Sequence, residues 1–188
     1  MRLGGLVLAA GQSRRFGADK RLAVLPDGRT VIAATLDRVR DVFPEILLVL
    51  RADETALGES LGVPFVTATD AHLGMAHSLA AGIAALPDWD GAAVLLGDMP
   101  FTRATTLKHL VEVFTENAGS DPIVVPVHDN RNGHPVIFAS RYFDEMAGIS
   151  GDGGARPVMT AHGDHVIRVV TDDAGVRQDI DLPADLPG

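Results

Sequence analysis

The chain has 188 residues, 46% of them hydrophobic, which suits one compact domain with a sizeable core and is too short for two domains and a linker. Its 25 acidic residues outnumber 16 basic ones, and the formal net charge of −9 argues against a nucleic acid or a membrane surface as partner, since both reward a basic surface. The chain has no cysteine, which excludes disulfides, zinc-thiolate sites and thiol nucleophiles and fits a cytoplasmic location.

Short apolar runs alternate with amphipathic stretches, a pattern typical of βαβ units and a mainly parallel sheet. Leu3–Ala9 predicts a first buried strand, and Thr30 is a candidate N-cap for the helix that follows. Further strands are predicted at Ile46–Leu50, Pro64–Ala68, Ala92–Leu96, Ile123–Val127, Val136–Ala139 and Val166–Val170. Helices are predicted near Glu54–Leu61, Met75–Leu86, Leu107–Phe114, Arg141–Ala147 and Ala155–His162. We therefore expect a single α/β domain over residues 1–188, three-layered and Rossmann-like, with a mixed sheet.

Polar, glycine-containing loops follow three of the predicted strands. Their sequences are AAGQSRRFGADK after the first strand, TDAHLGM after the third and GDMP after the fourth. Ligands of open parallel sheets bind at the carboxyl ends of the strands. The three loops therefore predict one binding site at that edge of the sheet.

The first loop has the composition of a triphosphate cradle. Gly11 and Gly17 let backbone amides approach an anion, and Arg15 and Lys20 add positive charge beside Ser13. The loop matches neither the Walker A pattern nor the dinucleotide-binding GxGxxG pattern. The alternative is an ordinary flexible loop between a strand and a helix.

Asp98 is the candidate metal ligand. It follows an apolar strand, where a carboxylate needs a partner, and Mg²⁺ takes one or two carboxylates together with phosphate oxygens and water. The alternative is that Asp98 caps the next helix, although Thr102 is better placed to do so.

The motifs together resemble one known family. LAAGQSRRFGADK is similar to the LAAGxSxRMGxxK signature of the nucleotidyltransferase family that includes the molybdenum cofactor cytidylyl- and guanylyltransferases. Five further segments of this kind follow in the family's order: GMAHSLAAGI, LLGDMP, NGHPVIF, SGDGGAR and DIDLPADL. The resemblance spans essentially the whole chain, with Phe16 in place of the usual methionine. It implies a nucleotidyltransferase fold and a Mg²⁺-dependent enzyme.

The resemblance also implies roles for individual residues. Lys20, Arg15 and Asp98 become catalytic, and Asp181 becomes a second metal contact beside Asp98, unless the acidic C-terminal segment is only a partly ordered tail. The residues expected to bind the nucleotide are Leu8, Ala9, Ala10, Gly11, Ser13, Gly74, Met75 and Ser78.

The resemblance suggests roles for three further positions. Gly82, like Gly74, is expected to permit close approach to the nucleotide base, while Ser78 offers it a hydrogen bond. His134 and Arg156 are candidates for binding the acceptor; the alternative for Arg156 is an exposed residue at a helix start.

The sequence segments LAAG and GMAHSL favour the cytidylyl branch. The predicted reaction moves CMP from CTP to the phosphate of molybdenum cofactor (molybdopterin) and releases pyrophosphate, with transient contact to a molybdoenzyme as a possible later step. Three alternatives stay open: GTP as donor, another small phosphorylated acceptor, and a cofactor-binding chaperone without catalysis. A Rossmann oxidoreductase is disfavoured, since Arg51 stands where an acidic ribose-binding residue would follow the second strand.

Overall fold

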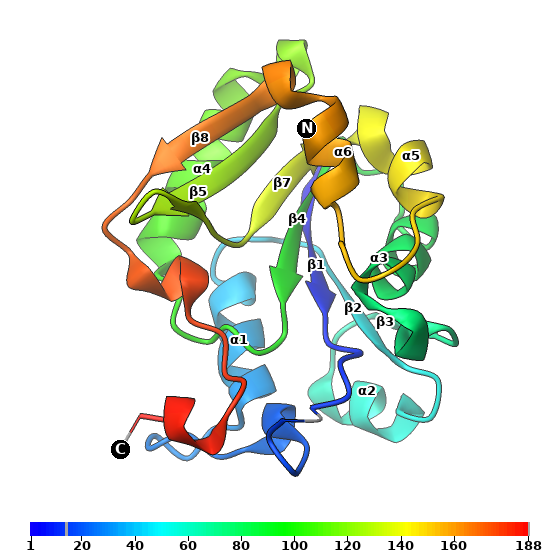
Figure 1. Cartoon of the computed structure of the whole chain (residues 1–188), viewed down its shortest axis with the longest axis vertical. Coiled ribbons are helices and arrows are strands. Elements are labelled where there is room, and N and C mark those ends of the chain that lie inside the picture. The colour runs from blue at the N-terminus through cyan, green and yellow to red at the C-terminus, as the bar shows by residue number, and fades with distance from the viewer. Residues whose placement is uncertain (14, 188) are drawn as a thin grey trace.

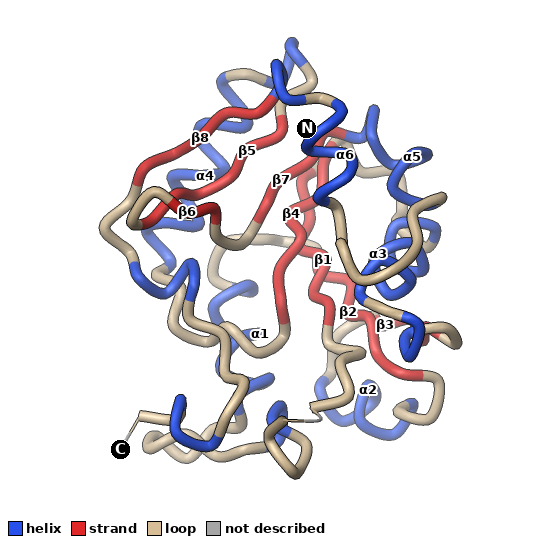
Figure 2. The backbone as a smooth tube through the Cα atoms, in the orientation of Figure 1, coloured by secondary structure: helices blue, strands red, loops and turns tan. Residues whose placement is uncertain are grey.

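The computed structural model describes residues 1–13 and 15–187, which form a three-layer α/β domain (Figures 1 and 2). The strands are β1 (Leu3–Leu8), β2 (Ile46–Arg51), β3 (Phe65–Ala68), β4 (Gly91–Leu96), β5 (Ile123–His128), β6 (Arg131–Asn132), β7 (Val136–Ala139) and β8 (Val166–Val170). The α-helices are α1 (Val31–Arg40), α2 (Thr55–Leu61), α3 (Met75–Ala84), α4 (Ala104–Glu116), α5 (Phe143–Ala147) and α6 (Arg156–Ala161).

All the strands belong to one mixed sheet. Its order is β3-β2-β1-β4-β7-β5-β6, and β8 pairs with β5. The four strands from β3 to β4 run parallel, while β7 is antiparallel to both β4 and β5. This confirms the expected mixed, mainly parallel sheet. The two-residue strand β6, inside a turn-rich segment, was not predicted.

Successive residues of the central strand β1 contact helices on opposite faces of the sheet. A side chain at Gly5 would meet Val39 of α1, whereas the next residue, Leu6, lies against Gly82 of α3. Figure 1 likewise shows α1 and α4 on one face and α3 and α5 on the other. Gly82 therefore serves helix-to-sheet packing, and the prediction that it approaches the nucleotide base is wrong, because its neighbours are core side chains.

The two predicted helix caps had different outcomes. Thr30 caps α1 as predicted, since its Oγ1 accepts a hydrogen bond from Ala33 N at 3.3 Å. Thr102 does not cap α4; its hydroxyl donates to the carbonyl of Gly175. Instead, Oδ2 of buried Asp173 accepts a hydrogen bond at 2.8 Å from the amide of Arg103, the residue before α4.

After β8 the chain returns across the carboxyl edge of the sheet. Ile180, which is fully buried, donates its amide to the carbonyl oxygen of Asp98 at 3.0 Å. This bond holds Asp179 and Asp181 next to the loop that follows β4. The segment is short and irregular, as predicted, but it is anchored to the site. No helix in the described part of the chain has the length and apolar character needed to cross a membrane.

Candidate active site

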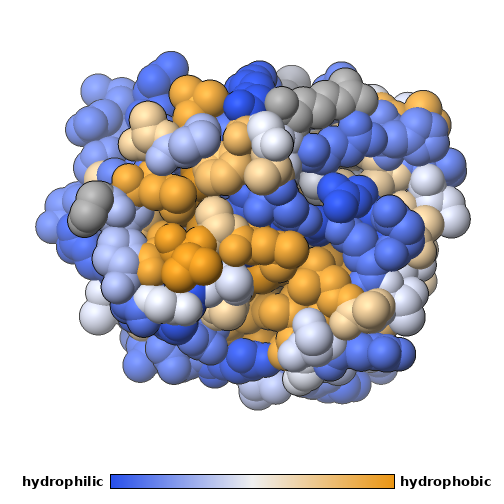
Figure 3. Space-filling view, turned by 90° about the horizontal axis from the view of Figure 1, so that it is seen from below, coloured by the Kyte–Doolittle hydropathy of each residue, from blue (hydrophilic) through white to orange (hydrophobic). Residues whose placement is uncertain are grey.

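A cavity of about 510 Å³ opens at the carboxyl ends of β1 and β4. Figure 3 looks onto this end of the molecule and shows an apolar hollow bordered by hydrophilic surface. The lining contains every residue predicted to bind nucleotide, and with them Lys20, Arg15, Asp98 and Asp181. The three predicted loops therefore do converge on one site.

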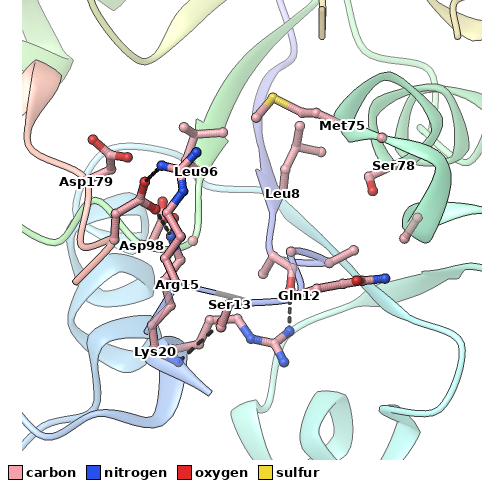
Figure 4. A pocket seen from close by; sticks show the side chains of 18 of the residues that line it. Leu8, Gln12, Ser13, Arg15, Lys20, Met75, Ser78, Leu96, Asp98 and Asp179 are labelled. Atoms are coloured by element: carbon pink, nitrogen blue, oxygen red, sulfur yellow. Dashed lines mark hydrogen bonds and ion pairs between the residues drawn. The ribbon is translucent and has the colours of Figure 1, made fainter. Parts of the chain in front are cut away.

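Lys20 lies between two carboxylates at one side of the cavity. Its Nζ is 2.6 Å from Asp98 Oδ2 and 2.6 Å from Asp181 Oδ1, and Arg15 Nη1 lies 2.8 Å from the other oxygen of Asp181. Burial alone would lower the pKa of Lys20, but the carboxylates of Asp98 and Asp181 raise it above its usual value. The ammonium is therefore charged at neutral pH. Figure 4 shows Lys20, Arg15 and Asp98 on one side of the cavity and Met75 and Ser78 on the other.

Local structure places the lysine. The loop turns at Gly17, whose φ of 80° suits glycine, and Asp19 caps the short 3₁₀ turn that begins at Lys20. The amide of Lys20 also donates to Ser13 Oγ at 3.3 Å. Gly11, by contrast, has open space around it and no positive φ, so the protein's own packing does not require glycine there.

Asp98 is the most buried of the carboxylates in the cavity. Burial raises its pKa, the nearby Lys20 opposes this, and the negative charge of Asp179 raises it further. Asp181 behaves oppositely, because its hydrogen bond from Lys20 lowers its pKa despite some burial. Asp98 Oδ1 is buried and has no hydrogen-bond partner among the described residues.

This donor set fits a hard divalent cation. A buried carboxylate oxygen that lacks a partner, with further carboxylates in the same cavity, suits Mg²⁺, which completes its octahedron with phosphate oxygens and water. No group of three or more His, Cys, Asp or Glu residues within the described residues forms an all-protein metal cage. A cation held by these carboxylates would therefore keep positions for the oxygens of a phosphorylated ligand.

The opposite side of the cavity is formed by the start of α3. Gly74 has a φ of 131°, and a side chain there would lie 2.4 Å from the carbonyl oxygen of Gly151 and 2.5 Å from the Asp152 carboxylate. Gly74 thus lets the loop around residue 151 pack against α3. Ser78, one turn into the helix, is buried and lines the cavity.

The two predicted acceptor residues do not line this cavity. His134 lies beside it, in a small cavity with Met99 and Leu107, and Arg156 is exposed at the first residue of α6. Burial lowers the pKa of His134, although the Val94 backbone and the carboxylate of Asp98 oppose the shift. The ring is therefore neutral at pH 7, and its Nδ1 has no hydrogen-bond partner in the described chain.

Several lining residues were not predicted. Gln12, Arg21, Asp152 and Asp179 all contribute to the cavity wall. Gln12, Asp152 and Asp179 lie inside motifs quoted above, so their polarity is a signal in the sequence. Arg21 follows the predicted lysine directly, but its role depends on a contact with Glu54, just before α2, that spacing does not reveal.

The chain is similar to a known protein family and to several solved structures. Residues 5–166 match the model of the MobA-like NTP transferase domain. The chain is 28% identical to the purine catabolism protein PucB of Bacillus subtilis (strain 168), over 95% of this chain and 91% of that protein. The crystal structure of Rv0371c from Mycobacterium tuberculosis H37Rv is 30% identical with a TM-score of 0.82, covering 98% of this chain and 95% of that one. A structure of Rv0371c in complex with manganese is 29% identical with a TM-score of 0.78, covering 98% of this chain and 96% of that one.

Proposed function

Because this chain belongs to the MobA-like NTP transferase family, we propose that it moves CMP from CTP to the phosphate of a molybdopterin-type acceptor and releases pyrophosphate. Membership makes the chain a nucleotidyltransferase; the donor and the acceptor are the proposal. The observation that carries it is the position of Lys20 between Asp98 and Asp181, inside the cavity formed by the first loop and α3.

The nucleotide is held at three places. The amides of the first loop bind the triphosphate together with Arg15 and Lys20, all of which line the cavity. The N–H end of an amide carries partial positive charge and the two side chains carry full positive charge, so each attracts the phosphate oxygens. Leu8 and Met75 supply apolar contact for the base, and Ser78 offers a hydroxyl to the base or the sugar. The sequence segments LAAG and GMAHSL favour cytosine over guanine as the base.

Asp98 and Asp181 would hold Mg²⁺ together with phosphate oxygens of the nucleotide. When bound, the ion neutralises charge on the phosphates. The manganese complex of Rv0371c supports a divalent cation in this fold. Lys20 pairs with both carboxylates, so nucleotide binding would draw the lysine from the carboxylates toward the phosphates.

The chemical step needs no strong base. A phosphate monoester has a second pKa of about 6, so the acceptor oxygen is an anion at neutral pH. This oxygen attacks the α-phosphorus, the bond between that phosphorus and the bridging oxygen breaks, and pyrophosphate leaves with the electron pair. Lys20 and Arg15 stabilise the departing negative charge. We assign the acceptor to the side of the cavity near His134 and Arg156; neither residue lines the cavity, and the charge of Arg156 contributes to the lowered pKa of His134.

A panel of CTP, GTP, ATP and UTP with Mg²⁺, read by thermal shift, tests the donor. A ligand at one hundred times its dissociation constant stabilises the fold by about 2.7 kcal/mol. CTP should give the largest shift; a larger shift with GTP would reject the cytidylyl assignment and keep the reaction class. Tight binding of the acceptor without pyrophosphate release from any nucleotide would favour a chaperone instead. Co-purification with a molybdoenzyme would test the transient partner.

A further inference from the structure

A second set of charged groups lies behind the first loop. Arg21 and Glu54 are almost fully buried, with 2% and 9% exposure, and Asp19 and Arg51 flank them. Arg21 Nε donates to Asp19 Oδ1 at 2.8 Å, and Arg21 Nη1 donates to Glu54 Oε2 at 2.8 Å. Arg51 also pairs with Glu54, and its amide donates to the same carboxylate at 3.0 Å. The two positive and two negative charges balance.

Both arginines also bind the backbone of the first loop. Arg21 donates to the carbonyl oxygen of Ala9, and Arg51 Nη1 donates to the carbonyl oxygen of Gly11 at 3.0 Å. The loop amides show the opposite pattern: those of Ala10, Gly11 and Ser13 have no hydrogen-bond partner in the residues that the structure describes. The network therefore holds carbonyls of the loop and leaves its amides available to a ligand.

We infer that Asp19, Arg21, Glu54 and Arg51 form a positioning network that orients the first loop for a polyphosphate, an inference that rests on the proposed function of this cavity. A carbonyl oxygen carries partial negative charge and repels a phosphate, whereas an amide attracts it. Holding the carbonyls of Ala9 and Gly11 on guanidinium groups prevents them from turning toward the ligand. Because the four charges balance, the network orients the loop without adding net charge that would compete with Lys20.

Buried ion pairs are weak sources of stability, because desolvation offsets most of the attraction. A merely structural role would anchor the turn at Lys20 and the start of α2, and its loss would lower the unfolding temperature alone. A positioning role predicts in addition a loss of affinity that depends on the phosphates and not on the base. The two readings therefore differ in a measurable way.

Arg51 is the best residue to change, since its side chain is 28% exposed and the fold should tolerate its loss. We expect Arg51→Gln to weaken binding of CTP, GTP and inorganic triphosphate by one common factor of roughly ten, the scale of a charge-assisted hydrogen bond. Arg51→Lys should recover most of this affinity, because an ammonium can still donate to Gly11. The matched control is Arg29→Gln, which removes a surface arginine paired with Asp27.

Calorimetric titration of each variant with Mg²⁺ and each ligand decides the matter. Wild-type affinity for triphosphate in Arg51→Gln would overturn the inference and leave the proposed function standing. A loss confined to one nucleotide would overturn it too, because the effect would then concern the base. If Arg51→Gln does not fold, Arg51→Lys must show a smaller, base-independent loss. Failure of the wild-type protein to bind either a nucleotide or inorganic triphosphate would overturn both proposals.

Discussion

The Lys20 ammonium lies 2.6 Å from Asp98 Oδ2, a pair that joins the glycine loop after β1 to the loop after β4. The side chains are largely buried, with 11% and 18% exposure, so water screens the pair only partly. Asp98 keeps its second oxygen without a partner in the described chain. One oxygen of Asp98 is therefore paired with Lys20, and the other can accept a further contact.

Replacement of Lys20 by alanine should weaken triphosphate binding and slow turnover by about two orders of magnitude, the scale of losing one group that stabilises developing charge. Hydrophobic packing does not depend on this side chain, so the fold should persist. The matched control is Lys108→Ala, which changes the chain's only other lysine, an exposed residue of α4. Pyrophosphate release by both variants is the measurement; equal rates would remove Lys20 from the mechanism.

Asp98→Asn should fold with unchanged or raised thermal stability in the absence of nucleotide. The raised pKa of Asp98 means that burial and Asp179 disfavour its charged form in the fold by more than Lys20 favours it, so a neutral amide relieves that cost. The transferase rate should fall by about two orders of magnitude, and added Mg²⁺ should restore it only in part. Thermal unfolding and a rate assay test both halves. A fully active Asp98→Asn variant would exclude the carboxylate as a metal ligand.

His134 predicts a pH dependence of stability. Its pKa is lowered in the fold by burial, so below about pH 6.5 the unfolded chain binds a proton that the native chain does not. Stability should therefore fall as the pH drops through that value. His134→Gln should show a shallower decline between pH 8 and pH 5.5, measured as unfolding temperature, whereas His109→Gln, at an exposed site, should follow the wild type. Parallel curves for all three proteins would show that His134 does not contribute.

Gly74→Ala should destabilise the protein by about 1 to 3 kcal/mol. Its φ of 131° is strained for alanine, and the added carbon would lie 2.4 Å from the carbonyl oxygen of Gly151. Nucleotide affinity should also fall, since the start of α3 would shift. Gly119→Ala, in open space with no positive φ, is the control, and denaturant unfolding of both variants gives the comparison. Equal stabilities would mean that the loop at Gly151 simply moves aside.

Most of the fold could be predicted from local pattern. Buried strands such as β1 and β4 are continuous apolar runs, and the cap of α1 lies within three residues of its target, so both leave a signal in short windows. The contact of Asp173 with the start of α4 could not be found in this way, because Asp173 is 70 residues away from the amide of Arg103. The structure alone supplies that contact.

In the site, too, some residues can be predicted from local sequence and others depend on contacts between distant segments. Lys20 and Asp98 follow apolar strands in polar loops, a signal that needs no tertiary information. Gly82 was misread because a glycine on a helix is equally suited to contact a ligand or a sheet, and only the packing against Val49 distinguishes the two. The network of Arg21 and Glu54 joins two distant segments, and neither residue differs in sequence from an ordinary surface charge.

Pyrophosphate release from purified wild-type protein with CTP, Mg²⁺ and molybdopterin together is the most direct test of the proposed reaction. We expect release that requires all three components, with product containing CMP linked to the acceptor phosphate, and slower release when GTP replaces CTP. Faster release with GTP would contradict the choice of donor. No release with any of the four nucleotides, under conditions where the protein binds CTP and molybdopterin, would contradict the proposed reaction itself.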